Sequence, residues 1–161
     1  MMRTRYACIL TVLSLLIAYS FCTSYWLYAQ KSGSNDAPLQ NATSGSSLNV
    51  LLEPTSYPVK VNDSSTKFKV SFLKPGTSTV QEHVDFNLRI YDNKNNRVFQ
   101  ATNLTGQPEV PLHATEGVMT IPMLNYKFNQ LGQYMIEIPV YGILFNPIRP
   151  EFANFTLNVV G

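Results

Sequence analysis

Apolar and polar side chains alternate with a period of two along much of the chain after residue 48. The clearest run follows a polar turn that ends at Gly132, where four apolar residues fall on one face of an extended strand: Tyr134, Ile136, Ile138 and Val140. Gln133 and Glu137 fall on the other face. A strand with one apolar face needs a second layer to cover it. The pattern therefore predicts a β-sandwich or a β-barrel.

Shorter runs of the same kind recur between turn signals. They lie at 57–61, 68–72, 84–90, 119–123 and 153–159, and a return strand is predicted at 97–99 after a turn at 92–96. A proline-rich loop is expected over Gly142 to Glu151, and no helical pattern occurs after residue 29. About seven strands without helices are typical of an immunoglobulin-like antiparallel β-sandwich, which is the predicted fold class.

The amino-terminal part of the chain has a different pattern. Residues 1–5 are short and basic, and residues 6–29 carry no charge. As a helix the uncharged run would be about 36 Å long, enough to cross a hydrocarbon core of about 30 Å. We favour an uncleaved transmembrane signal anchor over a removed signal peptide, because the candidate exit at 27–29 has an unsuitable first residue. Arg3 and Arg5 place the amino terminus in the cytoplasm, so the rest of the chain is expected outside the cell.

The residues after the anchor divide into a linker and a domain. Residues 30–48 are rich in Ser, Gly, Asn and Gln, which predicts a flexible linker, and residues 49–161 are expected to form the extracytoplasmic domain. Cys8 and Cys22 both lie in the anchor, so the domain is expected to fold without a disulfide. The net charge of +2 comes from Arg3 and Arg5 alone, since ten basic and ten acidic residues follow. This balance gives no reason to expect nucleic acid as a partner.

Two resemblances extend this interpretation. The spacing of Phe128, Gly132, Tyr134, Ile136 and Ile138 resembles the entry to strand F of immunoglobulin-like, fibronectin-type and PKD-type domains. The resemblance implies a tyrosine that anchors a corner by hydrogen bonding to upstream backbone. The segments 112–122 and 142–151 are similar to a group of small membrane-anchored or secreted proteins of ammonia-oxidising archaea. That group has no established activity, so this resemblance implies location and fold and assigns no functional residue.

Four sequons mark candidate glycosylation sites in an exported domain: Asn41, Asn62, Asn103 and Asn154. All four are expected to be exposed, in the linker, in loops or on the polar face of a strand. The alternative is that the four sequons occur by chance in a chain that is rich in Asn, Ser and Thr.

The expected loop over 142–151 concentrates apolar residues that form a possible partner-binding surface: Ile143, Leu144, Phe145, Pro147 and Ile148. A loop of this composition more often folds back and closes the open end of the core. We therefore favour the closing role over the binding surface.

Imidazole and thioether groups suit copper, and the exported domain has four candidates of these kinds: His83, His113, Met119 and Met123. Met119 and Met123 also alternate as core residues do, and the domain lacks the thiolate that a blue-copper site requires. We therefore expect no metal site. The sequence contains no nucleophile elbow, zinc-type spacing or phosphate-binding glycine loop, so we expect no catalytic residue, no cofactor and no enzymatic activity.

The function predicted from the sequence is interaction. We expect a single-pass membrane protein that contacts lipid through residues 6–29 and presents an extracytoplasmic module for binding, adhesion or envelope assembly. Its protein partner is not specified by any residue pattern. The alternatives are a copper-handling accessory protein and a small subunit of a larger membrane complex.

Overall fold

The computed structural model describes residues 38–123 and 126–161. These residues form antiparallel sheets and one short 3₁₀ helix, η1 (Ala101–Thr105), which confirms the all-β prediction. No helix in the two described ranges has the length and apolar character needed to cross a membrane. The predicted anchor at 6–29 lies outside these ranges.

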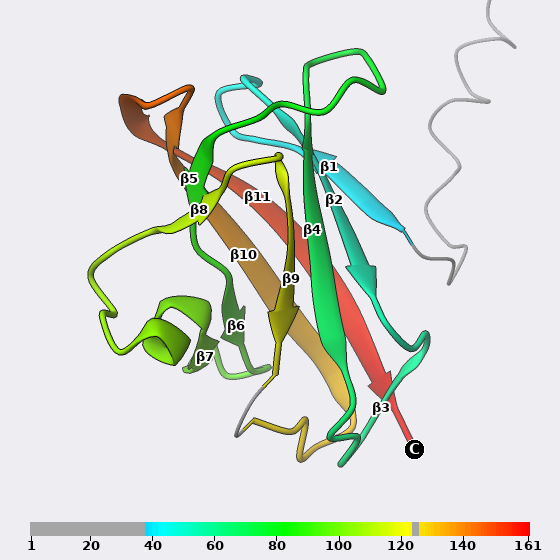
Figure 1. The fold of residues 1–161 in the computed structure, drawn as a ribbon. Coiled ribbons are helices and arrows are strands. Elements are labelled where there is room, and N and C mark those ends of the chain that lie inside the picture. The colour runs from blue at the N-terminus through cyan, green and yellow to red at the C-terminus, as the bar shows by residue number, and fades with distance from the viewer. Residues whose placement is uncertain (1–37, 124–125) are drawn as a thin grey trace, which may run out of the picture. The chain divides into compact units, whose positions relative to one another are not determined.

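The strands are arranged in two sheets (Figure 1). The first has the order β1 (Leu39–Ala42), β2 (Asn49–Pro54), β4 (Lys67–Leu73) and β9 (Val118–Pro122). The second has the order β3 (Val59–Lys60), β11 (Asn146–Val160), β10 (Gly132–Ile143), β5 (Val84–Phe86) and β8 (Leu112–Ala114). In addition, β6 (Arg89–Tyr91) pairs with β10 and with β7 (Arg97–Gln100). Only the short β3–β11 pair among these is parallel.

The core lies between the two sheets and follows the predicted alternation. Tyr134 and the three apolar residues that alternate after it in β10 are buried, and in β11 the alternate residues from Ala153 to Val159 are buried as well. Phe72 of β4 packs against Phe86 of β5 across the sheets, with ring centroids 4.8 Å apart. The described chain contains eleven strands rather than about seven. β1 lies in the predicted linker, the predicted run at 84–90 is divided into β5 and β6, and β8, with three residues, is too short for alternation to reveal.

The hydrogen bond expected at the corner before β10 is present. The Tyr134 hydroxyl donates to the backbone carbonyl of Gln130 over 3.3 Å. Its ring lies edge-on to Phe128, with centroids 4.9 Å apart, so the turn before β10 is fastened to the core by both a polar and an apolar contact.

The linker prediction is wrong over residues 39–48. Residues 39–42 form β1, which pairs with β2 at the edge of the first sheet, and Leu48 is buried. Thr43 and Ser47 donate hydroxyl hydrogen bonds to the carboxylate of Glu151 in β11. Pairing with β2, burial of Leu48 and these bonds to Glu151, which lies more than a hundred residues away in sequence, together order the segment. Residues 30–37 of the predicted linker lie outside the described chain.

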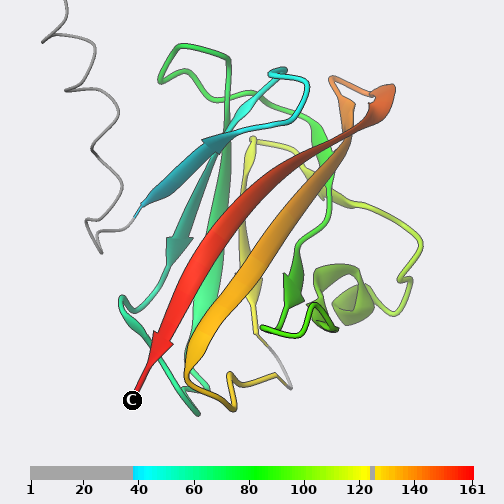
Figure 2. The same ribbon diagram turned by 180° about the vertical axis from the view of Figure 1, so that it is seen from behind.

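The loop predicted over 142–151 is instead the end of a long hairpin. β10 and β11 meet in a two-residue turn, Leu144–Phe145, closed by the pair Ile143 and Asn146. The register shifts near Tyr141, which stands opposite three residues of β11, and the hairpin bends toward its tip (Figures 1 and 2). Pro147 and Pro150 suggested a loop, but β10 is the only strand paired with this part of β11 in the described residues. An unpaired strand edge tolerates proline.

Candidate functional site

The two histidines of the chain meet beside the tip of the β10–β11 hairpin. His83 directly precedes β5, and His113 lies on β8 opposite Asp85 of β5. Residues directly opposite in an antiparallel pair place their side chains on the same face. We call Asp85, His83, His113, Leu144 and Phe145 the histidine corner.

A chain of hydrogen bonds connects the three polar side chains of the histidine corner. His113 Nδ1 lies 2.7 Å from Asp85 Oδ1, and His113 Nε2 lies 3.2 Å from His83 Nδ1. With both imidazoles neutral and Asp85 ionised, one arrangement of protons satisfies both contacts, in which each histidine donates from Nδ1 and His113 accepts at Nε2. The carboxylate therefore fixes which nitrogen of His113 carries the lone pair.

Phe145 covers the imidazoles from the hairpin tip. Its ring centroid lies 4.1 Å from that of His83 and 5.7 Å from that of His113. Phe145 nevertheless remains 69% exposed, and its neighbour Leu144 is 51% exposed. The corner therefore presents apolar and imidazole surface together at one end of the domain.

The backbone of the histidine corner is strained. His83, Leu144 and Phe145 have φ values of 52°, 51° and 64°, in the left-handed region that side chains other than glycine rarely adopt. The Leu144 amide donates to the His83 carbonyl over 2.8 Å, which joins the two strained segments. Gly142 supports the arrangement, since a Cβ there would lie 2.6 Å from Asp85 Oδ2. Strained backbone of this kind gathers at functional sites more often than elsewhere.

Only part of the candidate copper set comes together. Met119 lies in β9 of the other sheet and packs against the core. Met123 directly follows β9 and is buried. The two methionines are core residues, and only the two histidines meet. Within 38–123 and 126–161 no group of three or more His, Cys, Asp or Glu side chains is arranged to hold a metal ion.

The five apolar residues considered for the loop over 142–151 divide between the closing role and the binding surface. Ile143 and Ile148 pack against the core, as a closing role requires. Leu144, Phe145 and Pro147 are exposed, as a binding surface requires. The exposed residues are the two of the turn and Pro147, which lies two positions after it.

The four sequon asparagines are all exposed in the structure, in β1, after β3, in η1 and in β11 respectively: Asn41, Asn62, Asn103 and Asn154. The Asn41 side-chain amide donates to the backbone carbonyl of Asn154 over 2.9 Å. Two of the candidate sites therefore lie side by side on β1 and β11.

Comparison with known proteins gives no family. No family model and no curated protein matches the chain. Among solved structures, the chain is similar to the crystal structure of Parabacteroides merdae β-glucuronidase with glycerol in its active site. The identity is 15% and the TM-score is 0.40, and the match covers 76% of this chain and 13% of the enzyme. A likeness this weak has no bearing on the activity of this protein.

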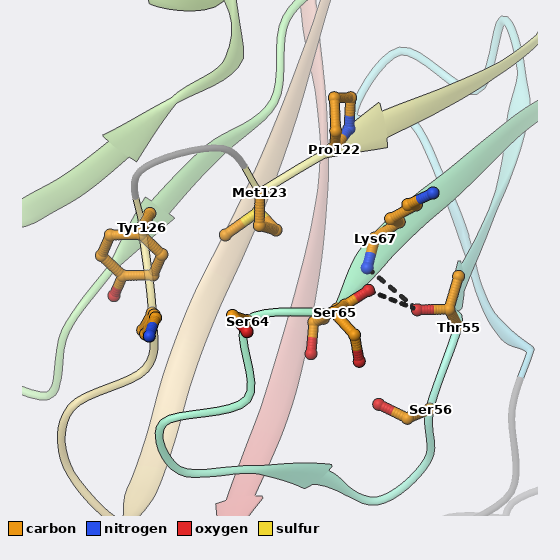
Figure 3. Close-up of a pocket in the computed structure, with 10 residues that line it drawn as sticks. Thr55, Ser56, Ser64, Ser65, Lys67, Pro122, Met123 and Tyr126 are labelled. Atoms are coloured by element: carbon orange, nitrogen blue, oxygen red, sulfur yellow. Dashed lines mark hydrogen bonds between the residues drawn. The ribbon is translucent and has the colours of Figure 1, made fainter.

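A separate hollow of about 800 Å³ lies beside the first residue of β4, Lys67 (Figure 3). Its lining includes Ser56, Ser65 and Thr66, whose hydroxyls all donate to Asp63. The Ser65 hydroxyl and amide are the main reasons why the pKa of Asp63 falls to about 2. These hydroxyls stabilise the turn, so they are not oriented toward a ligand.

A smaller hollow of about 470 Å³ lies beside η1 and includes Arg89 in its lining. Arg89 donates to Glu137 over 3.0 Å and to the Tyr141 hydroxyl over 2.9 Å. Burial lowers the pKa of Arg89, but the interaction with Glu137 and its neighbours outweighs burial and raises it. The guanidinium is already paired with a carboxylate, which reduces its attraction for an anionic ligand.

Sequence reasoning identified both histidines but missed Asp85 and Gly142. Asp85 alternates with His83 on the polar side of the predicted strand, so the two side chains were expected on one face. The partner strand β8 has only three residues, too few for alternation to reveal its pairing with β5. The contact between Asp85 and His113 was therefore not predictable from pattern alone.

Proposed function

We propose that this chain is a membrane-anchored extracytoplasmic binding module that contacts a partner protein and catalyses no reaction. Residues 6–29 cross the membrane as an uncleaved anchor with residues 1–5 in the cytoplasm. Beyond it, an immunoglobulin-like domain presents the tip of the β10–β11 hairpin. The resemblance of segments 112–122 and 142–151 to small archaeal proteins supports the location.

Two observations support the immunoglobulin-like part of the proposal. The described residues form two sheets over one apolar core, and every strand pair except β3–β11 is antiparallel. The Tyr134 hydroxyl bonds to backbone four residues upstream, as tyrosine corners do in such sandwiches.

The observation that carries the binding proposal is the chemistry of the hairpin tip. Two-residue hairpin turns with positive φ at both positions favour Asn and Gly, which adopt that backbone at little cost. This turn instead holds Leu144 and Phe145, both with positive φ and both more than half exposed. Neither stability nor solubility favours large apolar side chains there. Exposed aromatic anchors are common among the residues that dominate protein interfaces.

A photo-crosslinking experiment in intact cells tests the proposal. A photoreactive phenylalanine analogue replaces Leu144 in the full chain. The matched control places the same analogue at Leu131, an exposed apolar residue (62%) just before the opposite end of β10. We expect one discrete protein adduct from position 144 and none from position 131. The absence of a discrete adduct from 144, or the same adduct from both positions, would contradict the proposal.

The sequons add a modification to this proposal. Exposure of all four asparagines favours a glycan on at least one of them. Intact-mass measurement of the chain from its native cells, compared with an Asn103→Gln variant and equivalent variants at the other three sites, tests this. A mass equal to that of the bare polypeptide would refute it.

A further inference from the structure

We propose that His83 and His113 form a binding site for a divalent transition-metal ion that accepts imidazole ligands in trans positions, such as Cu²⁺. The ion lies between His83 Nδ1 and His113 Nε2 and replaces the hydrogen bond that joins them. This site uses neither of the core methionines, and it does not depend on the proposed role of the hairpin tip.

The two nitrogens face each other across the site. They are 3.2 Å apart while the ring centroids are 5.5 Å apart, so each nitrogen points almost directly at the other. Metal–imidazole bonds are about 2.0–2.1 Å long. A linear bridge therefore needs the nitrogens to separate by roughly 0.8–1.0 Å. Both histidines are only partly buried, so this adjustment does not disturb the core.

Binding of the ion requires the proton on His83 Nδ1 to move to another atom. In the hydrogen-bonded state His83 donates from Nδ1 to His113. When the ion binds at Nδ1, the proton of His83 moves to its Nε2, so the neutral pair binds the ion without net release of a proton. Protonated imidazole has no lone pair for the ion, so acid competes with binding.

Asp85 gives His113 the geometry of a metal ligand. Its Oδ1 accepts the Nδ1 proton of His113 over 2.7 Å, which leaves Nε2 as the lone pair directed at His83. Histidine ligands in proteins are commonly oriented by a carboxylate on the second ring nitrogen, and loss of that carboxylate weakens metal binding about 10–100-fold. Gly142 provides the space in which the Asp85 carboxylate sits. Asp85 is thus a positioning residue.

The remaining coordination positions fall to water, because no third His, Cys, Asp or Glu completes a ligand group among the described residues. A two-histidine site open to water binds its ion more weakly than a closed four-ligand site. Among divalent ions of this series Cu²⁺ binds nitrogen sites most tightly. Cu²⁺ is therefore the most sensitive probe.

The test is a titration of the full chain with Cu²⁺ in detergent, followed by calorimetry and by electron paramagnetic resonance. Cys8 and Cys22 are replaced by serine throughout, so that their thiols do not bind or reduce the ion. The chain has only two histidines, and it is purified without a histidine tag. We expect one ion per chain and a spectrum with hyperfine structure from two imidazole nitrogens.

Three variants locate the site. His83→Asn retains a residue that tolerates the left-handed backbone at this position, and His113→Gln retains a polar side chain. Each is expected to weaken binding at least tenfold, and Asp85→Asn to weaken it about 10–100-fold. Circular dichroism confirms that each variant is folded. Absence of stoichiometric binding, or binding that survives in the His83→Asn/His113→Gln double variant, overturns the site. Unchanged affinity in Asp85→Asn overturns the orienting role of Asp85.

Discussion

Replacing the hairpin turn Leu144–Phe145 with Asn–Gly distinguishes two roles for these residues: a contact surface for a partner, or a plug that closes the core. The double variant Leu144→Asn/Phe145→Gly replaces both residues with the pair that a turn of this backbone favours. Relief of the left-handed backbone contributes about 1–2 kcal/mol per residue, or about 2–4 kcal/mol in total. This gain is set against the apolar contacts that the two side chains make.

Those contacts have a comparable magnitude. Leu144 is about half buried and Phe145 about one-third buried, against about 1.5–3 kcal/mol for complete burial of each. The loss from both is about 1–2.5 kcal/mol, and loss of the aromatic stack on His83 adds about 0.5–1.5 kcal/mol. The gain and the loss nearly cancel. We therefore expect the free energy of unfolding to change by less than about 1 kcal/mol.

Chemical denaturation of the full chain in detergent measures this change. Because the single tryptophan, Trp26, lies in the predicted anchor, unfolding of the domain is followed by the near-ultraviolet circular dichroism of its tyrosines. Removal of two core side chains would cost about 2–5 kcal/mol each. A loss above about 3 kcal/mol would therefore refute the surface assignment. Near-neutral stability with loss of partner capture is the expected result.

Two further predictions concern the framework of the domain. Gly117→Ala is expected to lower the free energy of unfolding by about 2–5 kcal/mol, because the new methyl group would lie 2.1 Å from the Gln81 carbonyl oxygen at a φ of +68°. Gly76→Ala is the control, since it has the same φ with no heavy atom within 4 Å and should lose only about 1–2 kcal/mol; equal losses would contradict the steric argument. For Glu151, burial alone would raise the pKa of the carboxyl, but hydrogen bonds from Ser47 and other residues of its loop outweigh burial and lower it. A lowered pKa in the folded state means that this group stabilises the domain above its unfolded pKa and that the stabilisation is lost as the pH falls through its folded pKa. The stability difference between the native chain and Glu151→Gln should therefore shrink on acidification, and a constant difference would refute the linkage.

The sequence predicted those parts of the fold that depend on the alternation of apolar and polar residues within a single strand. The alternation in β10 and β11 identified the buried faces of both strands, and the spacing around Tyr134 implied the hydrogen bond to Gln130. Each of these features depends on residues close together in the chain. Local pattern is sufficient for them.

The features that sequence analysis missed depend on distant contacts or on unfavourable local choices. Residues 39–48 resembled a linker because part of what orders them, the contact with Glu151, lies far along the chain. The hairpin turn was hidden because Leu144 and Phe145 are poor residues for its backbone. The histidine corner required the pairing of β5 with β8, which neither segment indicates by itself. Positions where local preference conflicts with the fold are frequently functional.

The place of β1 in the domain has a mechanical consequence for a tethered protein. β1 is the outermost strand of its sheet and the first described strand of the chain, so tension from a membrane anchor would reach it before any other strand. Its four register pairs, from Leu39–Leu52 to Ala42–Asn49, provide the first resistance. The next contacts under tension would be the hydrogen bonds between the loop after β1 and the Glu151 carboxylate on β11 in the other sheet. The hydroxyl bonds of Thr43 and Ser47 to Glu151 would therefore oppose detachment of this loop once β1 had separated from β2.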